Sequence, residues 1–588
     1  MAKNIPQNKI ILKQNGYGKS LGDISSSFNL DLTSNYGAIR TTGMKLVTSN
    51  ATQTDLDVPV SFQFYNGSYY ALCDDFVFRG GDVMSDAFQK DTRTNAPDGE
   101  PNDARDDMKV FNGSLYVSSS TEVFKLTGST WSSPVTTGIT SSVHLLEAWE
   151  DRLYITNGGT KVFSINTSDV ISATGTATFD TKLNNDEWAI TMIKASSSSL
   201  WIGLLNYKNG EGLVYQWDGE TENTYTNLYK VPNGVAAGVI KDNIPYIMDF
   251  SGKLLAFSGG SFQEVGRLFK EKKQLFYGSS DSNNDRFMHP NGMSITPNNT
   301  IKFLISNQLN NVTDFRAYEN DIPSGIYEYD PQIGIYHNYS PSYSAVNTTT
   351  VTDYGQQRLD RNTTSGALYV RYANQINEVS DNGTLLAGFR YQTNASAGTN
   401  FGIFIDDNLD TTQKFGYLVT TRQQAEQVIE TWKSVYASYK RLNNATDKIV
   451  VKYRTDELPS TEATITWVTE SSFTTTTNIS AYGEDNEVQV IQGRGSGKSS
   501  QIATISEAGG TYTVTLDDSY AGASGTAKCL LSNFKKAGEI SIAGGDDRWK
   551  EMPTNQDNIS YWIQYKVCLQ FTGENELYRI RAINEVLV

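Results

Sequence analysis

The stretch VIQGRGSGKSS, residues 490–500, contains the residue types of a phosphate-binding loop. Its first glycines precede Gly497, Lys498 and Ser499, and in a P-loop such residues surround the phosphates and bind Mg²⁺. The spacing does not fit, because the position that needs the first glycine is Gln492. The residues that follow alternate between apolar and polar types, which predicts a strand and not the required helix. We therefore predict a glycine-rich hairpin turn with a solvated lysine at its tip.

Histidine and cysteine, which supply many nucleophilic and metal sites, are scarce. The three histidines are His144, His289 and His337. No two of them share a segment, so no metal-binding histidine pair is visible. No Ser-His-Asp elbow is visible either. His144 lies in an apolar stretch, where we expect a hydrogen-bonded core residue. The three cysteines are Cys73, Cys529 and Cys568. Their number and spacing do not fit a zinc site or a disulfide framework, and although the last two could meet, we expect buried free thiols.

Carboxylates are plentiful but show no catalytic pattern. A glycosidase needs a pair of carboxylates, yet 65 acidic residues supply such pairs by chance. The Ser-x-Asp-x-Gly-x-x-Trp turn of sialidase propellers is not found. The acidic clusters DARDD (103–107) and DSNND (281–285) do not have the spacing of a calcium loop. The sequence therefore predicts no catalytic, cofactor-binding or metal-binding residue, and a protein that is not an enzyme.

Length and charge limit the class of protein. A chain of 588 residues should hold two to four domains, since single cores rarely exceed roughly 250–300 residues. The net charge of −16 argues against a broad nucleic-acid-binding face and leaves room only for a local basic lining. No apolar run approaches the roughly 18 residues of a membrane span, and the first residues lack the apolar core of a signal peptide. We expect synthesis and folding in a cytoplasm.

A short aromatic-centred strand recurs through the first 400 residues. Its copies are centred on Tyr70, Tyr116, Tyr154, Trp201, Tyr246, Phe303 and Tyr369. Each is followed by a second strand of similar pattern, centred on Phe78, Phe124, Phe163, Tyr215, Leu255, Tyr327 and Asn377. Most of the first strands follow a turn such as YNG or FNG. A period near 45 residues, built from strands and turns, is typical of a four-stranded propeller blade.

These repeats predict the fold of the N-terminal two thirds. We expect an all-β protein with a seven-bladed β-propeller over residues 44–400; an eighth, degenerate blade is an alternative, as is a long β-sandwich with coincidental spacing. The strand GMKLVT (43–48) is expected to close the ring. Residues 1–43 would form an N-terminal arm.

The period stops after about residue 400, and the C-terminal part differs. The segment 421–442 fits both a helix and a strand, but its β-branched and aromatic residues favour a strand. Other alternating segments predict an antiparallel β-sandwich platform over residues 401–461 and 536–588. Between them, residues 462–535 contain several short strands. The size of this segment fits a small β-barrel inserted in a sandwich loop, a position that tolerates insertions.

Several stretches resemble a known class of virion proteins. Residues 20–48, SLGDISSSFNLDLTSNYGAIRTTGMKLVT, resemble the opening of tailed-bacteriophage proteins that carry a propeller after an N-terminal arm. RLNNATDKIVVKYRT, NEVQVIQGRGSGKSSQIATIS and WIQYKVCLQFTGENELYRIRAIN resemble the C-terminal part of the same proteins. The architecture is similar to tail nozzle proteins of short-tailed phages, in which a propeller sits on a β-sandwich around the DNA channel. The inserted barrel departs from that pattern.

The resemblance implies a structural component of a bacteriophage tail, either a nozzle or a tail-tip ring protein. It would be made in the host bacterial cytoplasm and reside in the virion. It would assemble with other tail and neck proteins as a homo-oligomeric ring, a hexamer by resemblance, with phage DNA passing through the channel. The alternative is a receptor-binding adhesin that recognises host surface glycan through exposed aromatics such as Trp131 and Trp217. A glycosidase is a third hypothesis, without its signature turn.

Overall fold

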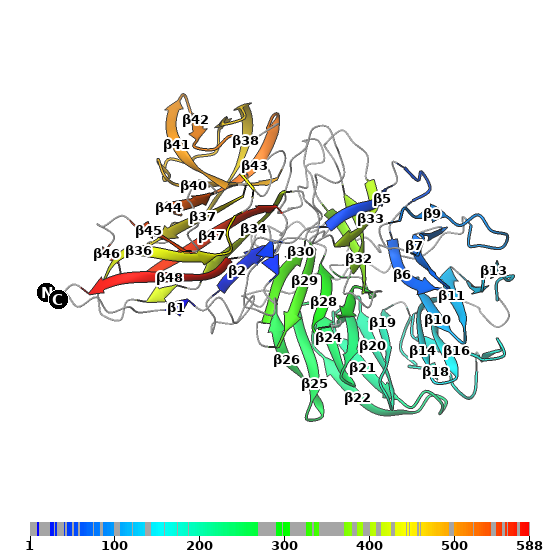
Figure 1. The fold of residues 1–588 in the computed structure, drawn as a ribbon. Coiled ribbons are helices and arrows are strands. Elements are labelled where there is room, and N and C mark those ends of the chain that lie inside the picture. Colours follow the sequence, from blue (N-terminus) through cyan, green and yellow to red (C-terminus); the bar gives the residue numbers. More distant parts are fainter. Residues whose placement is uncertain are drawn as a thin grey trace.

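The computed structural model consists of antiparallel β-sheets (Figure 1). It describes residues 9–10, 24–31, 40–268, 288–305, 325–339, 370–406, 413–541 and 549–586, with short gaps inside several of these ranges. Every regular element in the described residues is a β-strand, so the all-β prediction is confirmed. In the same residues no helix is long and apolar enough to cross a membrane.

Seven antiparallel sheets follow one another between residues 44 and 406 of the described chain. The first has β6 (Pro59–Tyr65), β7 (Ser68–Cys73), β8 (Phe76–Arg79) and β9 (Gln89–Lys90). The second has β10 (Met108–Phe111), β11 (Ser114–Ser119), β12 (Glu122–Thr127) and β13 (Thr130–Trp131). The third has β14 (Val143–Trp149), β15 (Arg152–Asn157), β16 (Lys161–Asn166), β17 (Ile171–Ser172) and β18 (Phe179–Asp180).

The remaining four sheets repeat this plan with longer outer strands. The fourth has β19 (Trp188–Ala195), β20 (Leu200–Asn206), β21 (Gly212–Trp217) and β22 (Tyr225–Val231). The fifth has β23 (Val235–Lys241), β24 (Ile244–Asp249), β25 (Lys253–Ser258) and β26 (Ser261–Arg267). The sixth has β27 (Met293–Ile295), β28 (Ile301–Ile305), β29 (Gly325–Asp330) and β30 (Gly334–Tyr339). The seventh has β31 (Val370–Glu378), β32 (Leu385–Tyr391), β33 (Asn400–Asp406) and β5 (Met44–Ser49).

Contacts between the first strands of these sheets form a closed cycle. In order, β6, β10, β14, β19, β23, β27 and β31 each contact the next, and β31 contacts β6 again. The seventh sheet takes its outer strand from the N-terminal side, because β5 pairs with β33 (Figure 1). This is the strand that the sequence predicted to close the ring. β33 extends the seventh sheet to Asp406, beyond the predicted boundary at residue 400.

The predicted aromatic-centred pairs are the second and third strands of the first six sheets. β11 pairs with β12, for example, with Tyr116 opposite Lys125. The seventh predicted pair is wrong. Asn377 lies in β31, the first strand of its sheet, which bulges twice and continues without a turn, because no glycine interrupts YANQINE. Tyr369 lies outside the described residues.

Tight turns between the first two strands explain why the repeat was visible in the sequence. Asn66 and Gly67 have φ angles of 46° and 74°, and Asn112 and Gly113 have φ angles of 44° and 70°. Two consecutive positive φ angles make the hairpin turn whose twist matches that of the strands. Asparagine and glycine adopt this backbone at the lowest cost, so YNG and FNG mark hairpin ends.

A two-sheet unit follows the seven sheets. Its five-stranded sheet contains β1 (Lys9–Ile10), β48 (Leu577–Val586), β36 (Glu430–Tyr439), β45 (Trp549–Pro553) and β46 (Ile559–Ser560). Its six-stranded sheet contains β2 (Ile24–Phe28), β34 (Gln413–Thr420), β47 (Trp562–Thr572), β37 (Lys448–Arg454), β44 (Lys535–Ser541) and β35 (Gln423–Gln424). The strand preference for the 421–442 segment is confirmed by β36.

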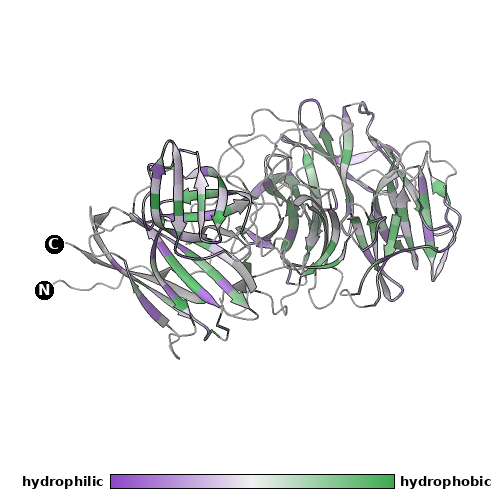
Figure 2. Ribbon diagram, turned by 90° about the horizontal axis from the view of Figure 1, so that it is seen from above, coloured by the Kyte–Doolittle hydropathy of each residue, from purple (hydrophilic) through white to green (hydrophobic). Residues whose placement is uncertain are grey.

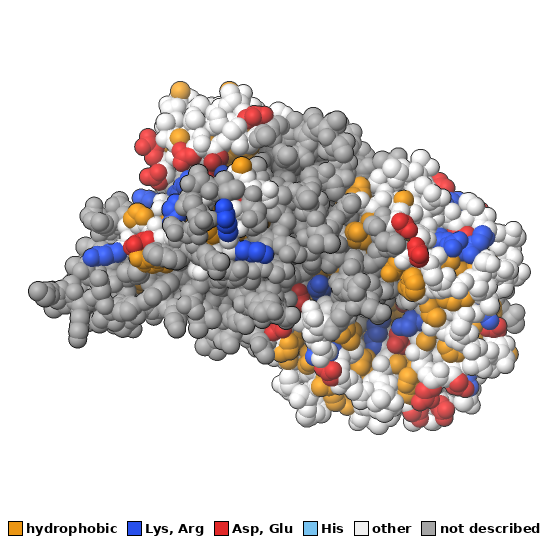
Figure 3. All heavy atoms as spheres, in the orientation of Figure 1, with side chains coloured by type: hydrophobic (Ala, Val, Ile, Leu, Met, Phe, Trp, Pro, Cys, Tyr) orange, Lys and Arg blue, Asp and Glu red, His pale blue; other side chains and the backbone are white. Residues whose placement is uncertain are grey.

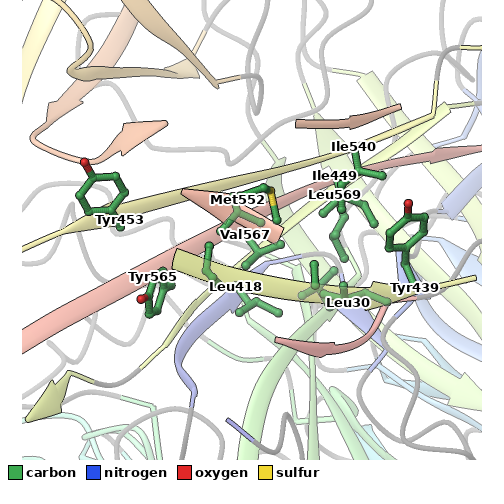
Figure 4. Close-up of a cluster of buried hydrophobic side chains, with 14 of the residues drawn as sticks. Leu30, Leu418, Tyr439, Ile449, Tyr453, Ile540, Met552, Tyr565, Val567 and Leu569 are labelled. Carbon is green, nitrogen blue, oxygen red and sulfur yellow. The ribbon is translucent and has the colours of Figure 1, made fainter. Parts of the chain in front are cut away.

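The two sheets share one apolar core, shown in Figure 4. Tyr439 and Met552 come from the five-stranded sheet, and Leu418 and Val567 come from the six-stranded sheet. Residues predicted as a free arm add strands to both sheets, because β1 pairs with β48 and β2 pairs with β34. A small ribbon of β3 (Leu30–Asp31) and β4 (Arg40–Thr41) follows, and Leu30 lies in this core.

A closed barrel of six strands is inserted in the two-sheet unit, as the sequence predicted. It contains β38 (Thr461–Thr469), β39 (Ser472–Thr475), β42 (Thr511–Leu516), β41 (Ser499–Ala508), β40 (Glu487–Gln492) and β43 (Thr526–Ser532) in that order around the wall. Apolar and polar positions alternate along its strands (Figure 2). The interior is apolar and includes Ile465, Phe473 and Val514.

Candidate functional site

The barrel rests on one face of the six-stranded sheet, and alternation on β37 determines which residues it meets. Ile449 and Val451 lie in the core between the two sheets. Because neighbouring side chains on a strand point to opposite faces, Lys452 points to the other face, where the barrel lies. Its ammonium group contacts Glu487 of the barrel strand β40. On β47, Lys566 reaches the same carboxylate.

These residues form a buried ionic cluster, made of Glu487, Lys452 and Lys566. Each ammonium Nζ lies 2.9 Å from the Glu487 carboxylate. The side chains of Glu487 and Lys452 are 1% exposed. Lys566 also donates to the amide oxygen of Gln489 (2.8 Å), and the Ser532 hydroxyl donates to Glu487 (2.8 Å). One carboxylate thus connects two strands of the sheet to the barrel.

The electrostatics of the cluster keep the carboxylate charged. Burial alone would raise the pKa of Glu487, but the ammonium groups of Lys452 and Lys566 lower it below its usual value. Hydrogen bonds from Ser499 and Lys452 act in the same direction. Removing one partner of a buried ion pair leaves an uncompensated charge, which costs roughly 3–5 kcal/mol. The cluster therefore favours one position of the barrel on the six-stranded sheet.

Ser499, the serine of the P-loop-like stretch, belongs to this cluster. Its hydroxyl donates to Glu487 Oε1 (2.5 Å) and accepts from the Lys452 ammonium. It begins β41, which pairs antiparallel with β40, so the predicted strand follows in place of a P-loop helix. The residues between these strands, Lys498 among them, lie outside the described residues.

A serine beside a lysine can also be a catalytic pair, which makes the protonation state decisive. A general base needs a free lone pair. The Lys452 Nζ lies 2.9 Å from Glu487, and although burial alone would raise the pKa of that carboxyl, its charged and hydrogen-bonded partners lower it. The Ser499 proton is directed to that carboxylate at 2.5 Å, inside the barrel contact. This geometry ties the barrel to the six-stranded sheet.

A small cavity of about 140 Å³ adjoins the cluster. It is lined by Lys448, Val450, Ser499, Asp518, Ser519, Tyr520, Cys568 and Gln570. Sites for small molecules usually measure about 300–1,000 Å³, so this space suits a few waters. Burial raises the pKa of the Cys568 thiol, which makes it a poor nucleophile at neutral pH. The Lys448 ammonium lies 3.5 Å from Asp518 across the rim.

The aromatic residues assigned to glycan binding are buried, which corrects that prediction. Trp217 is 0% exposed and Trp131 is 2% exposed. The Trp217 indole donates to the Thr221 carbonyl oxygen (2.8 Å), and the Trp131 indole donates to Asp91 (2.9 Å). Both rings are part of the packing between strands, because a large aromatic on an inward strand position fills the core. Neither is available to a ligand.

The histidines, the cysteines and the acidic stretches singled out in the sequence do not belong to the ionic cluster. His337 is fully buried, with its ring 5.0 Å from that of Tyr327; the His144 side chain and His289 lie outside the described residues. The three cysteines are buried and free, as predicted. Of the cluster DARDD, Asp107 accepts hydrogen bonds from Ser61 (2.8 Å) and from the backbone of Leu146 (3.2 Å).

Acidic residues do not assemble into a metal site in the part of the chain that the structure describes. The cluster DSNND (281–285) and most of DARDD lie outside that part. Sequence reasoning missed the ionic cluster itself. Its signal was an internal lysine in each of two largely apolar stretches, Lys452 in KIVVKYR and Lys566 in YKVCLQF. A lysine there must reach a partner, but the sequence does not say which carboxylate supplies it.

Comparison with known proteins adds little to this geometry. No protein-family model matches the chain, and no curated protein matches it. The N-terminal domain of Nup159 shares 11% identity at a TM-score of 0.33, covering 66% of this chain and 100% of that chain. Hsv2 of Kluyveromyces lactis shares 8% identity at a TM-score of 0.33, covering 63% and 95%. The computationally designed Ika8 protein shares 8% identity at a TM-score of 0.34, covering 61% and 99%. Similarity this low identifies neither a fold nor a function.

Proposed function

We propose that this protein is a structural component of a bacteriophage tail, a nozzle or tail-tip ring protein that assembles with other virion proteins. The observation that carries the proposal is the use of the buried charges at the barrel contact. Glu487, Lys452 and Lys566 hold two modules together and offer no activated nucleophile or base. We infer that the protein is not an enzyme. The resemblance of residues 20–48 and of the C-terminal stretches supplies the tail assignment.

We further propose that the seven sheets are the blades of a β-propeller and that the two-sheet unit is a β-sandwich platform. The closed cycle of contacts among first strands supports the propeller, since each blade must bury its faces against neighbours. The shared core of the two-sheet unit supports the sandwich. A propeller on a platform is the arrangement that the resemblance implies.

The connections between the two-sheet unit and the seven sheets suit a protein that must withstand mechanical force in a phage tail. β2, which is part of the two-sheet unit, contacts β30 of the sixth sheet. Tyr336 of β30 lies in the same buried cluster as Leu30 and Leu418 of the two-sheet unit. The N-terminal strands thus complete both sheets of the unit, and β5 completes the seventh sheet. A chain joined in this way resists relative motion of its modules.

In the proposed assembly, copies of the chain form a ring, a hexamer by resemblance, with the other tail and neck proteins above and below. Phage DNA would pass through the channel of that ring, and the protein would reside in the virion. The adhesin alternative has lost its two named contacts, because Trp131 and Trp217 are buried. No described residue is left as a named glycan contact for that alternative.

The test is the location of the protein in phage particles. Particles from a culture that produces the protein would be purified on a density gradient and labelled with gold-tagged antibodies raised against it. We expect gold at the tail end of each particle, and the protein in the particle fraction in several copies. Protein that stays entirely in the particle-free fraction would contradict the proposal.

A further inference from the structure

The outer strands of the seven sheets differ in how well their edges are protected. An edge strand exposes unpaired N–H and C=O groups, and proteins protect it by keeping it short, charged or covered. β9, β13, β17 and β18 have two residues each. β26 carries an ion pair between Glu264 and Arg267 (2.7 Å), and β30 is contacted by β2 and β3. β5 is held to the first sheet, where the Phe88 backbone N–H donates to Thr48 Oγ1 (2.8 Å).

β22 has fewer of these protections among the described residues: it contacts β26 of the next sheet and bulges once against β21, but it is long and no strand pairs with its outer edge. It is seven residues long and pairs only with β21. Its first four residues are exposed, with Tyr225 at 44% and Leu228 at 39%. Lys230, near its end, is the only charged residue in the strand. Figure 1 shows β22 on the outer side of its sheet, with no strand drawn along its far edge.

We propose that β22 binds β22 of a second copy of this chain, antiparallel, so that two four-stranded sheets become one of eight strands. The sequence YTNLYKV is self-complementary in this arrangement. Its central residue, Leu228, lies opposite Leu228 of the other copy, and apolar pairs of this kind stabilise a sheet. Lys230 falls opposite Thr226, so no like charges meet directly. Main-chain hydrogen bonds along both strands supply the remaining affinity.

Charge outside the strand favours the same orientation. The turn before β22 carries the exposed residues Asp218, Glu220 and Glu222. Figure 3 shows acidic side chains gathered at the lower end of this part of the molecule. In an antiparallel pair, the acidic turn of each copy lies beside the C-terminal end of β22 of the other copy, and Lys230 is near that end. A parallel pair would place the two acidic turns together and is disfavoured.

The contact is isologous, which means that the same surface of each copy takes part. It therefore joins two copies and leaves no free β22 edge for a third. It does not depend on the proposed role in a tail. A ring built through other surfaces would have its mass doubled by this contact, and a chain that forms no ring would dimerise. The ratio of masses between the wild-type protein and an edge variant therefore tests this proposal separately from the tail proposal.

The experiment measures particle mass by mass photometry and sedimentation for three full-length proteins. Wild type should have twice the mass of Leu228→Lys and of Leu228→Glu, because each substitution puts like charges opposite each other at the centre of the pair. An equimolar mixture of the two variants should recover the wild-type mass, since lysine then faces glutamate. Gln263→Lys, on the exposed part of β26, is the matched control and should leave the mass unchanged.

A second measurement keeps the proposal testable if the charged variants fold poorly. Leu228→Cys should form a disulfide-linked pair of chains under mild oxidation, whereas Gln263→Cys should not. Three outcomes would overturn the proposal: equal masses for wild type and Leu228→Lys, no recovery of mass on mixing the two charged variants, or cross-linking that is no faster at residue 228 than at residue 263.

Discussion

The contact between the third and fourth sheets at Tyr154 and the contact between barrel and two-sheet unit use different chemistry. At Tyr154, aromatic packing and a neutral hydrogen bond join the third and fourth sheets: the Tyr154 ring lies 5.7 Å from that of Trp217, and its hydroxyl donates to the Gly219 carbonyl oxygen (2.9 Å). Other contacts between sheets include carboxylates, among them Asp107 and Glu147. At the barrel, charged groups are buried around Glu487. Apolar contacts tolerate small shifts, whereas a buried ion pair requires defined geometry. At Tyr154 the two sheets are joined by packing, whereas the inserted barrel is positioned by the ion pairs of Glu487.

The largest effect expected is on the barrel contact. Glu487→Ala leaves two buried ammonium groups without their carboxylate, and we expect a loss of roughly 3–5 kcal/mol in the free energy of unfolding. Urea unfolding followed by tryptophan fluorescence measures it. Glu484→Ala, an exposed carboxylate of the same barrel, is the control and should change stability by less than about 0.5 kcal/mol. Equal effects of the two substitutions would show that the cluster is not buried.

The contact between sheets should respond to loss of a ring. Tyr154 is 2% exposed, and Tyr154→Ala should reduce the free energy of unfolding by roughly 3–5 kcal/mol through the cavity that it leaves. Tyr154→Phe removes only the hydrogen bond to Gly219 and should cost about 0.5–1.5 kcal/mol. Chemical denaturation of both variants separates the two terms. A loss under about 1 kcal/mol for the alanine variant would place this residue at the surface.

The two contacts should also differ in their dependence on pH. The folded protein lowers the pKa of Glu487 below its usual 4.5, so the unfolded chain binds a proton more readily. This contribution to stability is fully present above about pH 5 and decreases as the pH falls below 4.5. The stability difference between wild type and Glu487→Gln should therefore shrink between pH 5 and pH 3. The difference between wild type and Tyr154→Phe should stay constant, and a reversal of this pattern would contradict the assignment.

The smallest effect concerns the P-loop-like stretch. Lys498→Ala should change the melting temperature by no more than the equivalent of about 0.5 kcal/mol, as expected for a lysine at a turn. Millimolar Mg-ATP should not raise the melting temperature of either protein, since a strand follows Ser499 and no helix N-terminus is available for phosphate. A thermal-shift titration measures both. A saturable rise that disappears in the variant would indicate a nucleotide site.

Much of the fold could be predicted because its signals are local and repeated. Turns such as Asn66-Gly67 need positive φ angles that few residues adopt, so they mark hairpin ends. The inserted barrel was visible as a change in strand spacing. The seventh sheet was misread at Asn377, because bulges in β31 preserve a strand through residues that break the alternation. Such bulges are set by the pairing with β32 and are not visible in the sequence of β31 itself.

The ionic cluster could not be predicted for a related reason. Lys452, Glu487 and Lys566 are far apart in the sequence and meet only when the barrel is placed on the sheet. The burial of Trp131 and Trp217 is equally non-local. The Trp131 indole donates to Asp91, directly after β9 of the first sheet, and the Trp217 ring packs against Tyr154 of the third sheet. The adhesin alternative took these tryptophans to be exposed. Their environment depends on the neighbouring strands.

A double-mutant cycle between barrel and sheet tests most directly whether a buried ion pair positions the barrel. Unfolding free energies would be measured for wild type, Glu487→Gln, Lys452→Met and the double variant. Because the two side chains contact each other at 2.9 Å in a buried site, we predict a coupling energy of about 1.5–3 kcal/mol. Additive effects, with a coupling energy below about 0.5 kcal/mol, would contradict the account.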